Sequence, residues 1–230
     1  MGKGEAEMTR SGMSATLHYI YDPLCGWCYG AEPLVWSAAK ATDVELELHG
    51  GALWPKPTQL PEATRLYIRQ ADQRIAQMSG QRFGPAYHNG LLLDPTMVLE
   101  SRPPTAAVLA AQSIDRAKAL PMLRAIQHAH YEQGRRVVEP EVLTDIAVEV
   151  GIERAEFEAA LARARVDEHI EDTHRLMSRV GANGFPAFVL QIGEDLYPVP
   201  HGRFASQPAQ FGRWLEAQVK AHVDAGAPTH

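Results

Sequence analysis

Two cysteines separated by two residues, in the segment Cys25-Gly26-Trp27-Cys28, are the residues best suited to chemistry in this chain of 230 residues, which has no other cysteine. An apolar run at 17–21 precedes them and predicts a buried strand. The residues at 33–39 follow, with a composition that predicts the body of a helix. A CxxC pair between a strand and the first turn of a helix is typical of thiol–disulfide exchange.

The two cysteines are expected to have different roles. At the first turn of a helix, unpaired backbone N–H groups and the positive end of the helix dipole stabilise an anionic sulfur. A thiol attacks a disulfide only as its thiolate, so Cys25, at the exposed end of the helix, is predicted to be the nucleophile. Cys28, one turn further into the helix, is predicted to be more buried and to resolve the mixed disulfide.

Two other uses of a CxxC pair compete with redox chemistry. The pair could supply half of a zinc site, with histidines as the other ligands. His128 and His130 are the closest histidine pair, but their i, i+2 spacing on a predicted helix directs them to different faces. The cysteines could also form a purely structural disulfide, yet closing so short a loop removes little entropy from the unfolded chain. We therefore favour redox chemistry.

Composition and charge limit the classes of partner. Hydrophobic residues make up 45% of the chain and charged residues 22%, which is typical of a globular protein. The formal net charge of −6 and the lack of a strong basic patch argue against nucleic acid as the main partner, since the longest basic cluster is Arg135-Arg136. No window has the 18 or more apolar residues of a membrane span, and residues 1–14 lack the apolar core of a secretory signal. We therefore expect a cytoplasmic protein, in which a CxxC is more often catalytic than structural.

The hydrophobic periodicity predicts an α/β fold whose helices are concentrated in the middle of the chain. A strand, a helix and a strand at 16–21, 25–41 and 44–49 predict a right-handed βαβ unit with parallel strands. From 60 to 180 the periodicity is helical, although 83–99 is expected to be a loop near the cysteines. Strand signals return in a hairpin at 185–192 and 196–200, followed by a final helix.

This order of elements predicts three parts of the chain. Residues 1–14 are expected to be a mobile tail. Residues 15–59 and 181–225 are expected to form one α/β domain, and residues 60–180 a helical insertion into it.

A second element of the predicted site is Gly184-Phe185-Pro186, which opens the returning strand. This strand is expected to run antiparallel to the first and to bring its start beside the cysteines. The Phe185–Pro186 bond could be trans, as is common at a strand start, or cis, which costs an X–Pro bond only about 0.5–1 kcal/mol. In the cis form the backbone of Phe185 would face outward, where an extended peptide could pair with it.

At this point the chain resembles the thioredoxin-fold DsbA family, and most closely its FrnE-like branch of predicted protein-disulfide isomerases. The segments that carry the resemblance are YDPLCGWCYG at 21–30 and GFPAF at 184–188. The resemblance implies a thioredoxin-like fold with a four-stranded mixed sheet. It also implies that Cys25 is the nucleophile, Cys28 the resolving cysteine and Pro186 a cis-proline that faces them. The Gly-Trp pair between the cysteines and the lack of a visible signal peptide differ from DsbA and leave the direction of electron flow open.

We predict a dithiol–disulfide oxidoreductase or isomerase that acts on protein or peptide thiols and disulfides. Its redox partner is expected to be a small thiol or a thioredoxin-type protein, and neither an organic cofactor nor a metal is expected. Trp27 is predicted to be an exposed apolar platform for unfolded substrate, with packing against the insertion as the alternative. Asp22 could transfer a proton to Cys28, or could act only as a turn former before Pro23.

Two further classes of function remain as alternatives. Kappa-class glutathione transferases and 2-hydroxychromene-2-carboxylate isomerases share the expected fold, but typically have serine at the nucleophile position. The other alternative is a non-enzymatic redox sensor or chaperone, in which the disulfide alters surface exposure and partner affinity.

Overall fold

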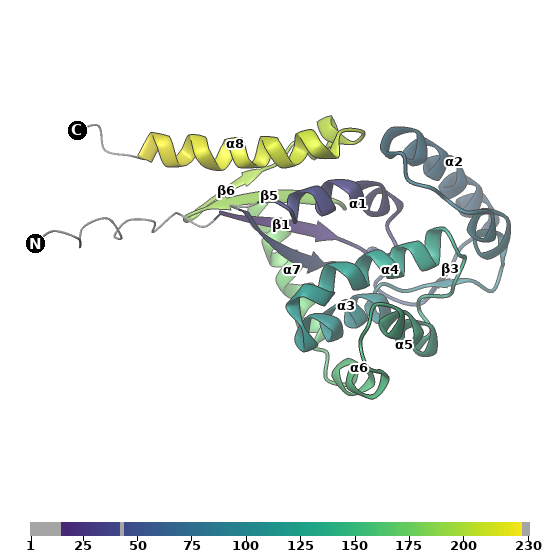
Figure 1. Ribbon diagram of the computed structural model, residues 1–230. Coiled ribbons are helices and arrows are strands. Elements are labelled where there is room, and N and C mark those ends of the chain that lie inside the picture. The colour runs from purple at the N-terminus through teal and green to yellow at the C-terminus, as the bar shows by residue number, and fades with distance from the viewer. Residues whose placement is uncertain (1–14, 42–43, 227–230) are drawn as a thin grey trace, which may run out of the picture.

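The computed structural model describes residues 15–41 and 44–226, in which a four-stranded mixed sheet is combined with a large set of helices (Figure 1). The spatial order of the strands is β2-β1-β5-β6. Strands β1 and β2 are parallel, whereas β5 is antiparallel to both of its neighbours, β1 and β6. The bounds of these strands are β1 Ala15–Tyr21, β2 Val44–Gly50, β5 Ala187–Ile192 and β6 Asp195–Pro198. This topology confirms the predicted βαβ and ββα halves.

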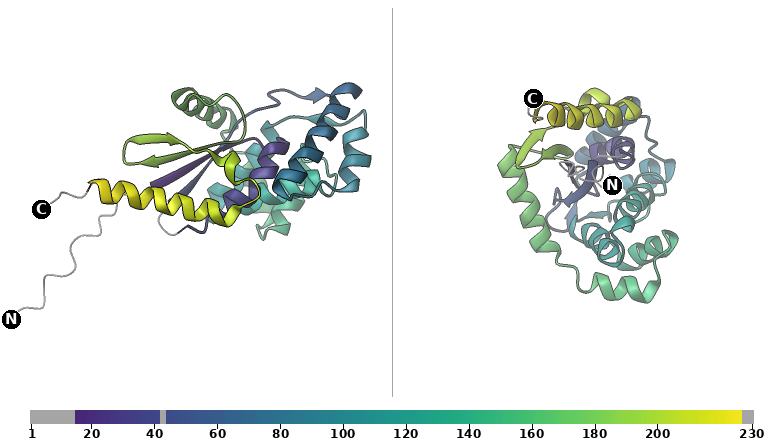
Figure 2. Two further views of the ribbon diagram at one scale, coloured as in Figure 1. Left: turned by 90° about the horizontal axis from the view of Figure 1, so that it is seen from above. Right: turned by 60° about the vertical axis from the view of Figure 1, so that its left-hand side comes forward.

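Strand β1 lies inside the sheet, and all of its residues except Thr16 are buried, including the polar His18. Its alternate residues Leu17, Tyr19 and Tyr21 share one face with their partners on β2 and β5. Helices α1 (Gly26–Ala38) and α8 (Pro208–Gly226) pack against each other on this face. Helix α7 (Val166–Val180) crosses the opposite face of the sheet and contacts both edge strands, β2 and β6 (Figure 2). The sheet therefore separates α7 from the helix that carries the two cysteines.

The helical insertion begins with α2 and lies beside α1 (Figure 1). Gly80 ends α2 and Gly181 ends α7, and both adopt the left-handed backbone conformation that glycine allows at a helix C-cap. Two very short strands, β3 (Thr58–Gln59) and β4 (Val98–Leu99), pair across the start of the insertion. The segment 60–180, predicted as the insertion, contains α2 Glu62–Ser79, α3 Arg102–Ile114, α4 Ala119–Tyr131, α5 Pro140–Glu149, α6 Arg154–Leu161 and also α7, which lies against the sheet.

An aromatic cluster joins the insertion to α1. Tyr29 of α1 stacks on Tyr131 of α4, with ring centroids 4.9 Å apart, and meets Phe83 edge-on at 5.3 Å. Tyr87 packs against Tyr131 and is buried. Short helical turns at Ala86–Gly90 and Leu91–Leu93 fill much of the segment that the sequence predicts as a loop. The cluster fixes the insertion beside the N-terminal half of α1.

Several boundaries differ from the predicted ones. The helix expected at 25–41 begins at Gly26 and ends at Ala38. The strand expected from 185 begins at Ala187. The predicted tail at 1–14 lies outside the described residues, as do 42–43 and 227–230. Within the described part of the chain, no helix is both long enough and apolar enough to cross a membrane.

Candidate active site

The two cysteines lie at the N-terminus of α1 as free thiols. Cys25 is the N-cap residue, with an extended backbone, and its N–H donates to the carbonyl of Asp22 at 3.2 Å. Cys25 is 6% exposed, whereas Cys28 is fully buried at 0%. Both residues are therefore buried, and the little exposed surface that the pair retains belongs to Cys25.

The returning strand brings Phe185 and Pro186 to Cys25. The Phe185–Pro186 peptide is cis, as the family resemblance implies. The Cys25 thiol faces the carbonyl oxygen of Phe185, with a distance of 3.6 Å from Sγ to the oxygen. A segment 160 residues further along the chain thus lies against the Cys25 sulfur.

Cys28 has a different environment. The backbone N–H of Asp22 donates to its Sγ at 3.4 Å, and the Tyr19 hydroxyl donates to its carbonyl oxygen at 3.1 Å. Burial raises the pKa of the Cys28 thiol, and the neighbouring Cys25 raises it further. A group is therefore needed to accept the Cys28 proton before this sulfur can attack.

The carboxyl group of Asp22 is the buried acid next to Cys28. Its Oδ1 accepts the N–H of Leu24 at 2.8 Å, and its Oδ2 accepts the N–H of Leu53 at 2.7 Å. Burial raises the pKa of Asp22 to about 6, although these two hydrogen bonds oppose the rise. Asp22 thus stabilises the turn before the motif, and its raised pKa makes it the candidate acceptor for the Cys28 proton.

Sequence reasoning missed a second buried acid, Asp72 of α2. A Cβ atom on Gly26, between the two cysteines, would lie 3.0 Å from the Asp72 Oδ1. Burial raises the pKa of Asp72 to about 7, and His88 Nε2 lies 3.4 Å from its Oδ2. The i, i+3 spacing of Asp72 and Ile75 places both on one face of α2, and the packing of that face on α1 buries them.

An apolar groove lies beside the cysteines, with a volume of about 240 Å³. Trp27, Phe185 and Pro186 all line it, so the structure brings together the three residues predicted to contact substrate. Trp27 is 41% exposed, and Met78 of α2, also exposed, forms part of the opposite wall. Neither cysteine lines the groove, but it shares Phe185 with the surroundings of Cys25.

Gly51 leaves room for the side chain of Phe185, because a Cβ atom on Gly51 would lie 2.2 Å from Cζ of the Phe185 ring. We expect Gly51→Ala to push this ring away, to lower the free energy of unfolding by about 1–3 kcal/mol and to slow disulfide exchange. Urea unfolding and turnover measure the two effects. Gly184→Ala is the control, since no atom lies within 4 Å of its added Cβ. If Gly51→Ala and Gly184→Ala had the same free energy of unfolding and the same turnover, this role for Gly51 would be contradicted.

Comparisons with known proteins agree with this geometry. The family model described as the DSBA-like thioredoxin domain matches residues 16–202. The cytosolic disulfide reductase DsbM from Pseudomonas aeruginosa is 44% identical, with a TM-score of 0.83, over 90% of this chain and 99% of that one. Its structure with GSH aligns at 43% identity and a TM-score of 0.81, over 89% and 99% of the two chains. No curated protein sequence matches the chain.

A more distant structure shares the fold alone. The 2-hydroxychromene-2-carboxylate isomerase structure has 15% identity and a TM-score of 0.60, over 92% of this chain and 100% of that one. The likeness supports a shared fold with this predicted alternative but not a shared chemistry. Proteins of that class are expected to have serine at the position that Cys25 occupies in this chain. The family match and the paired cysteines at the helix N-terminus agree on one conclusion: the chain belongs to the DsbA-like thioredoxin family and is a thiol–disulfide oxidoreductase.

Proposed function

We propose that this oxidoreductase works as a cytosolic disulfide reductase, with Cys25 as its nucleophile. The observation that carries the proposal is the asymmetry of the two cysteines, since Cys25 lies against the Phe185 carbonyl and keeps a small exposed surface, whereas Cys28 has none. The similarity to a protein named as a cytosolic disulfide reductase, at 44% identity, supports both the direction and the compartment.

The reaction requires two exchanges at sulfur. The Cys25 thiolate attacks a substrate disulfide, so that a Cys25–substrate disulfide forms and the first substrate thiolate leaves. Cys28 then gives up its proton to the Asp22 carboxylate and attacks the Cys25 sulfur. The second substrate thiolate leaves, and it is protonated from Asp22 or from water. The substrate disulfide gains two electrons and the enzyme pair becomes a disulfide.

The surroundings of Cys25 support a peptide or a small peptide-like thiol as substrate. An extended chain that crosses the site would pair with the backbone at Phe185 and place an apolar side chain in the groove lined by Trp27. Two molecules of a thiol such as glutathione would return the enzyme to its dithiol form. The structure of DsbM with GSH supports this choice of partner. The two sulfurs carry all the electrons, so the cycle calls for no organic cofactor.

The reduction potential and the turnover together test the proposal. The oxidised form of a reductase should have little tendency to transfer its disulfide to other proteins. We therefore expect a reduction potential nearer to the thioredoxin value of about −270 mV than to the DsbA value of about −120 mV. Thiol redox equilibration followed by mass spectrometry measures it. In a coupled assay the protein should reduce a mixed disulfide of glutathione over many cycles.

Two results would overturn this reading. A potential near that of DsbA would reverse the direction of electron flow. One round of reduction per chain, with no further turnover in excess thiol, would favour a redox sensor instead.

A further inference from the structure

A compact group of three side chains lies on the face of the sheet opposite α1, away from the cysteines. His18 on β1 pairs in register with Glu47 on β2, so their side chains point to the same face. His49 is two residues further along β2 and points to that face as well. The strands therefore place two imidazoles and one carboxylate together.

The three atoms that face one another form a small triangle. His18 Nδ1 and His49 Nε2 are 2.9 Å apart, and Glu47 Oε2 lies 3.4 Å from the first and 3.7 Å from the second. A point at the centre of this triangle is about 2 Å from each atom, close to the distances of Zn²⁺ from imidazole nitrogen and carboxylate oxygen. An ion could thus bind with little movement of these side chains.

Gln191 of β5 determines which nitrogen of His18 faces the triangle. The Gln191 amide nitrogen donates to the carbonyl of Gly193 at 2.9 Å, which orients its Oε1 toward His18. His18 Nε2 lies 2.8 Å from this oxygen and therefore carries the ring proton. The lone pair of Nδ1 is then directed at the triangle. Such a second partner behind a histidine is a regular feature of protein metal sites.

The two oxygens of Glu47 have separate partners. Arg116 lies 3.8 Å from Oε1, but its nearer partner is Glu45, at 2.7 Å. Oε2 is the oxygen that approaches the two imidazoles. Arg116 therefore leaves Oε2 available to a cation.

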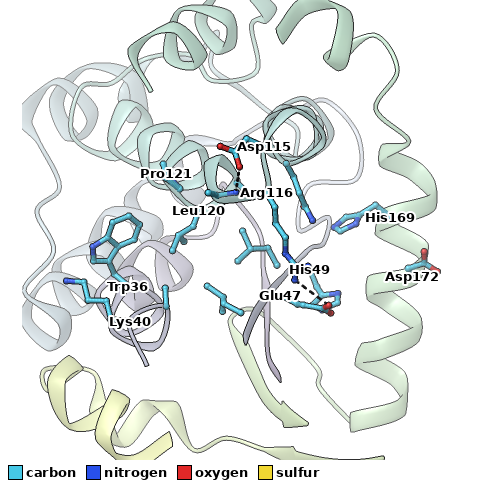
Figure 3. A pocket seen from close by; sticks show the side chains of 16 residues that line it. Trp36, Lys40, Glu47, His49, Asp115, Arg116, Leu120, Pro121, His169 and Asp172 are labelled. Atoms are coloured by element: carbon cyan, nitrogen blue, oxygen red, sulfur yellow. Dashed lines mark hydrogen bonds and ion pairs between the residues drawn. The ribbon is translucent and has the colours of Figure 1, made fainter. Parts of the chain in front are cut away.

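Glu47 and His49 of this group line a cavity of about 920 Å³ along β2, at the edge of the sheet, whereas His18 does not line it. Figure 3 shows Glu47 and His49 side by side on the wall of this cavity, with Arg116 near them. His169 of α7 also lines the cavity. An ion held by three protein atoms would have its next coordination position directed toward this cavity, where water or a small anion could bind. Sites with three protein ligands and an open position are typical of reactive or exchangeable zinc.

We propose that His18, Glu47 and His49 form a binding site for a divalent transition-metal ion of the Zn²⁺ class. The ligand atoms are His18 Nδ1, His49 Nε2 and Glu47 Oε2, and the ion takes the place of the proton that lies between the two rings. That proton moves to Nδ1 of His49. The ion would link edge strand β2 to the central strand β1. The site shares no residue with the redox pair, and it depends on the pairing of two strands that are distant in the sequence.

Zinc titration of the full chain tests the proposal. The titration uses Cys25→Ser/Cys28→Ser, because free thiols also bind zinc. Competition with a chromophoric chelator should show one saturable Zn²⁺ per chain. His49→Gln and Glu47→Gln, both at partly exposed positions, should each weaken binding by at least about 100-fold, and Gln191→Leu by about 10–100-fold. Co²⁺ should give a visible spectrum of nitrogen and oxygen ligands that His49→Gln abolishes.

Glu45→Gln is the matched control, because Glu45 lies on the same strand and contacts Arg116 but is no ligand. Its affinity for Zn²⁺ should stay within about threefold of the parent. Circular dichroism establishes that each variant is folded. The proposal is wrong if the folded parent shows no saturable binding, or if His49→Gln and Glu47→Gln bind as tightly as the Glu45→Gln control.

Discussion

Cys25→Ser should lower the rate of disulfide exchange by at least about a thousandfold, because a serine hydroxyl has a far higher pKa than a thiol and is a poor nucleophile toward sulfur. Cys28→Ser should behave differently. Its Cys25 can still attack, but the buried sulfur that completes the reaction is missing. This variant should therefore accumulate a mixed disulfide on Cys25.

Intact mass measurement after incubation with oxidised glutathione distinguishes the two variants. Cys28→Ser should carry one glutathione per chain, which a reducing agent removes. Cys25→Ser should carry none, since its remaining thiol is 0% exposed. The double variant is the control for adducts elsewhere. A stable adduct on Cys28 in the Cys25→Ser chain would reverse the assignment of nucleophile and resolving cysteine.

Asp22→Asn should slow the second exchange by about 100-fold at neutral pH while leaving the first exchange nearly unchanged. The Cys28 thiol has a pKa raised by burial, so its proton needs an acceptor, and an amide cannot serve. With a pKa of about 6, wild-type Asp22 is mostly ionised at pH 7 and able to accept the proton. The rate of the second exchange should therefore fall below pH 6 in the wild type, and should lose this inflection in Asp22→Asn.

Rapid mixing with a glutathione mixed disulfide, followed by acid quench and mass spectrometry, measures the two exchanges separately. A variant that slows both steps equally would indicate only a distorted turn, because Asp22 also accepts the N–H groups of Leu24 and Leu53. An unchanged second step would exclude Asp22 as the proton acceptor.

The same carboxyl group should affect stability with a definite sign. Its pKa in the folded chain is about 6, above the usual 3.8, so the fold favours the protonated form. This stabilisation is complete below pH 3.8 and is lost as the pH rises through 6, a change of about 3 kcal/mol. Relative to the wild type, Asp22→Asn should therefore gain stability between pH 4 and pH 7. Urea unfolding at both values measures the change, and equal differences at the two would contradict it.

The local parts of the site could be predicted from sequence. The spacing of Cys25 and Cys28, and their place between an apolar strand and a helix, depend on neighbouring residues alone. The antiparallel return of β5 follows from the order of elements, and the Gly-Phe-Pro segment marks where it begins. These features identified the pair and the segment that faces it.

The parts that sequence reasoning missed depend on contacts between distant elements. The inward direction of Asp72 toward Gly26 is set by how α2 packs on α1. The contact of Gly51 with the Phe185 ring, and the approach of His18 to His49, follow from the packing and register of the strands. The segment at 83–99 lacks a regular hydrophobic period, so its short helical turns could not be predicted. Aromatic contacts of Phe83 and Tyr87 with Tyr131 hold these turns in place.

The burial of Cys28 beside Cys25 also affects how the protein reacts with peroxide. Peroxide that reaches the site meets Cys25 first and converts it to a sulfenic acid. The adjacent Cys28 thiol condenses with that group, forming the Cys25–Cys28 disulfide and releasing water. The reaction stops at a state that thiols can reverse, before the irreversible sulfinic and sulfonic acids are reached. The arrangement that serves exchange thus also protects the protein from permanent oxidative damage.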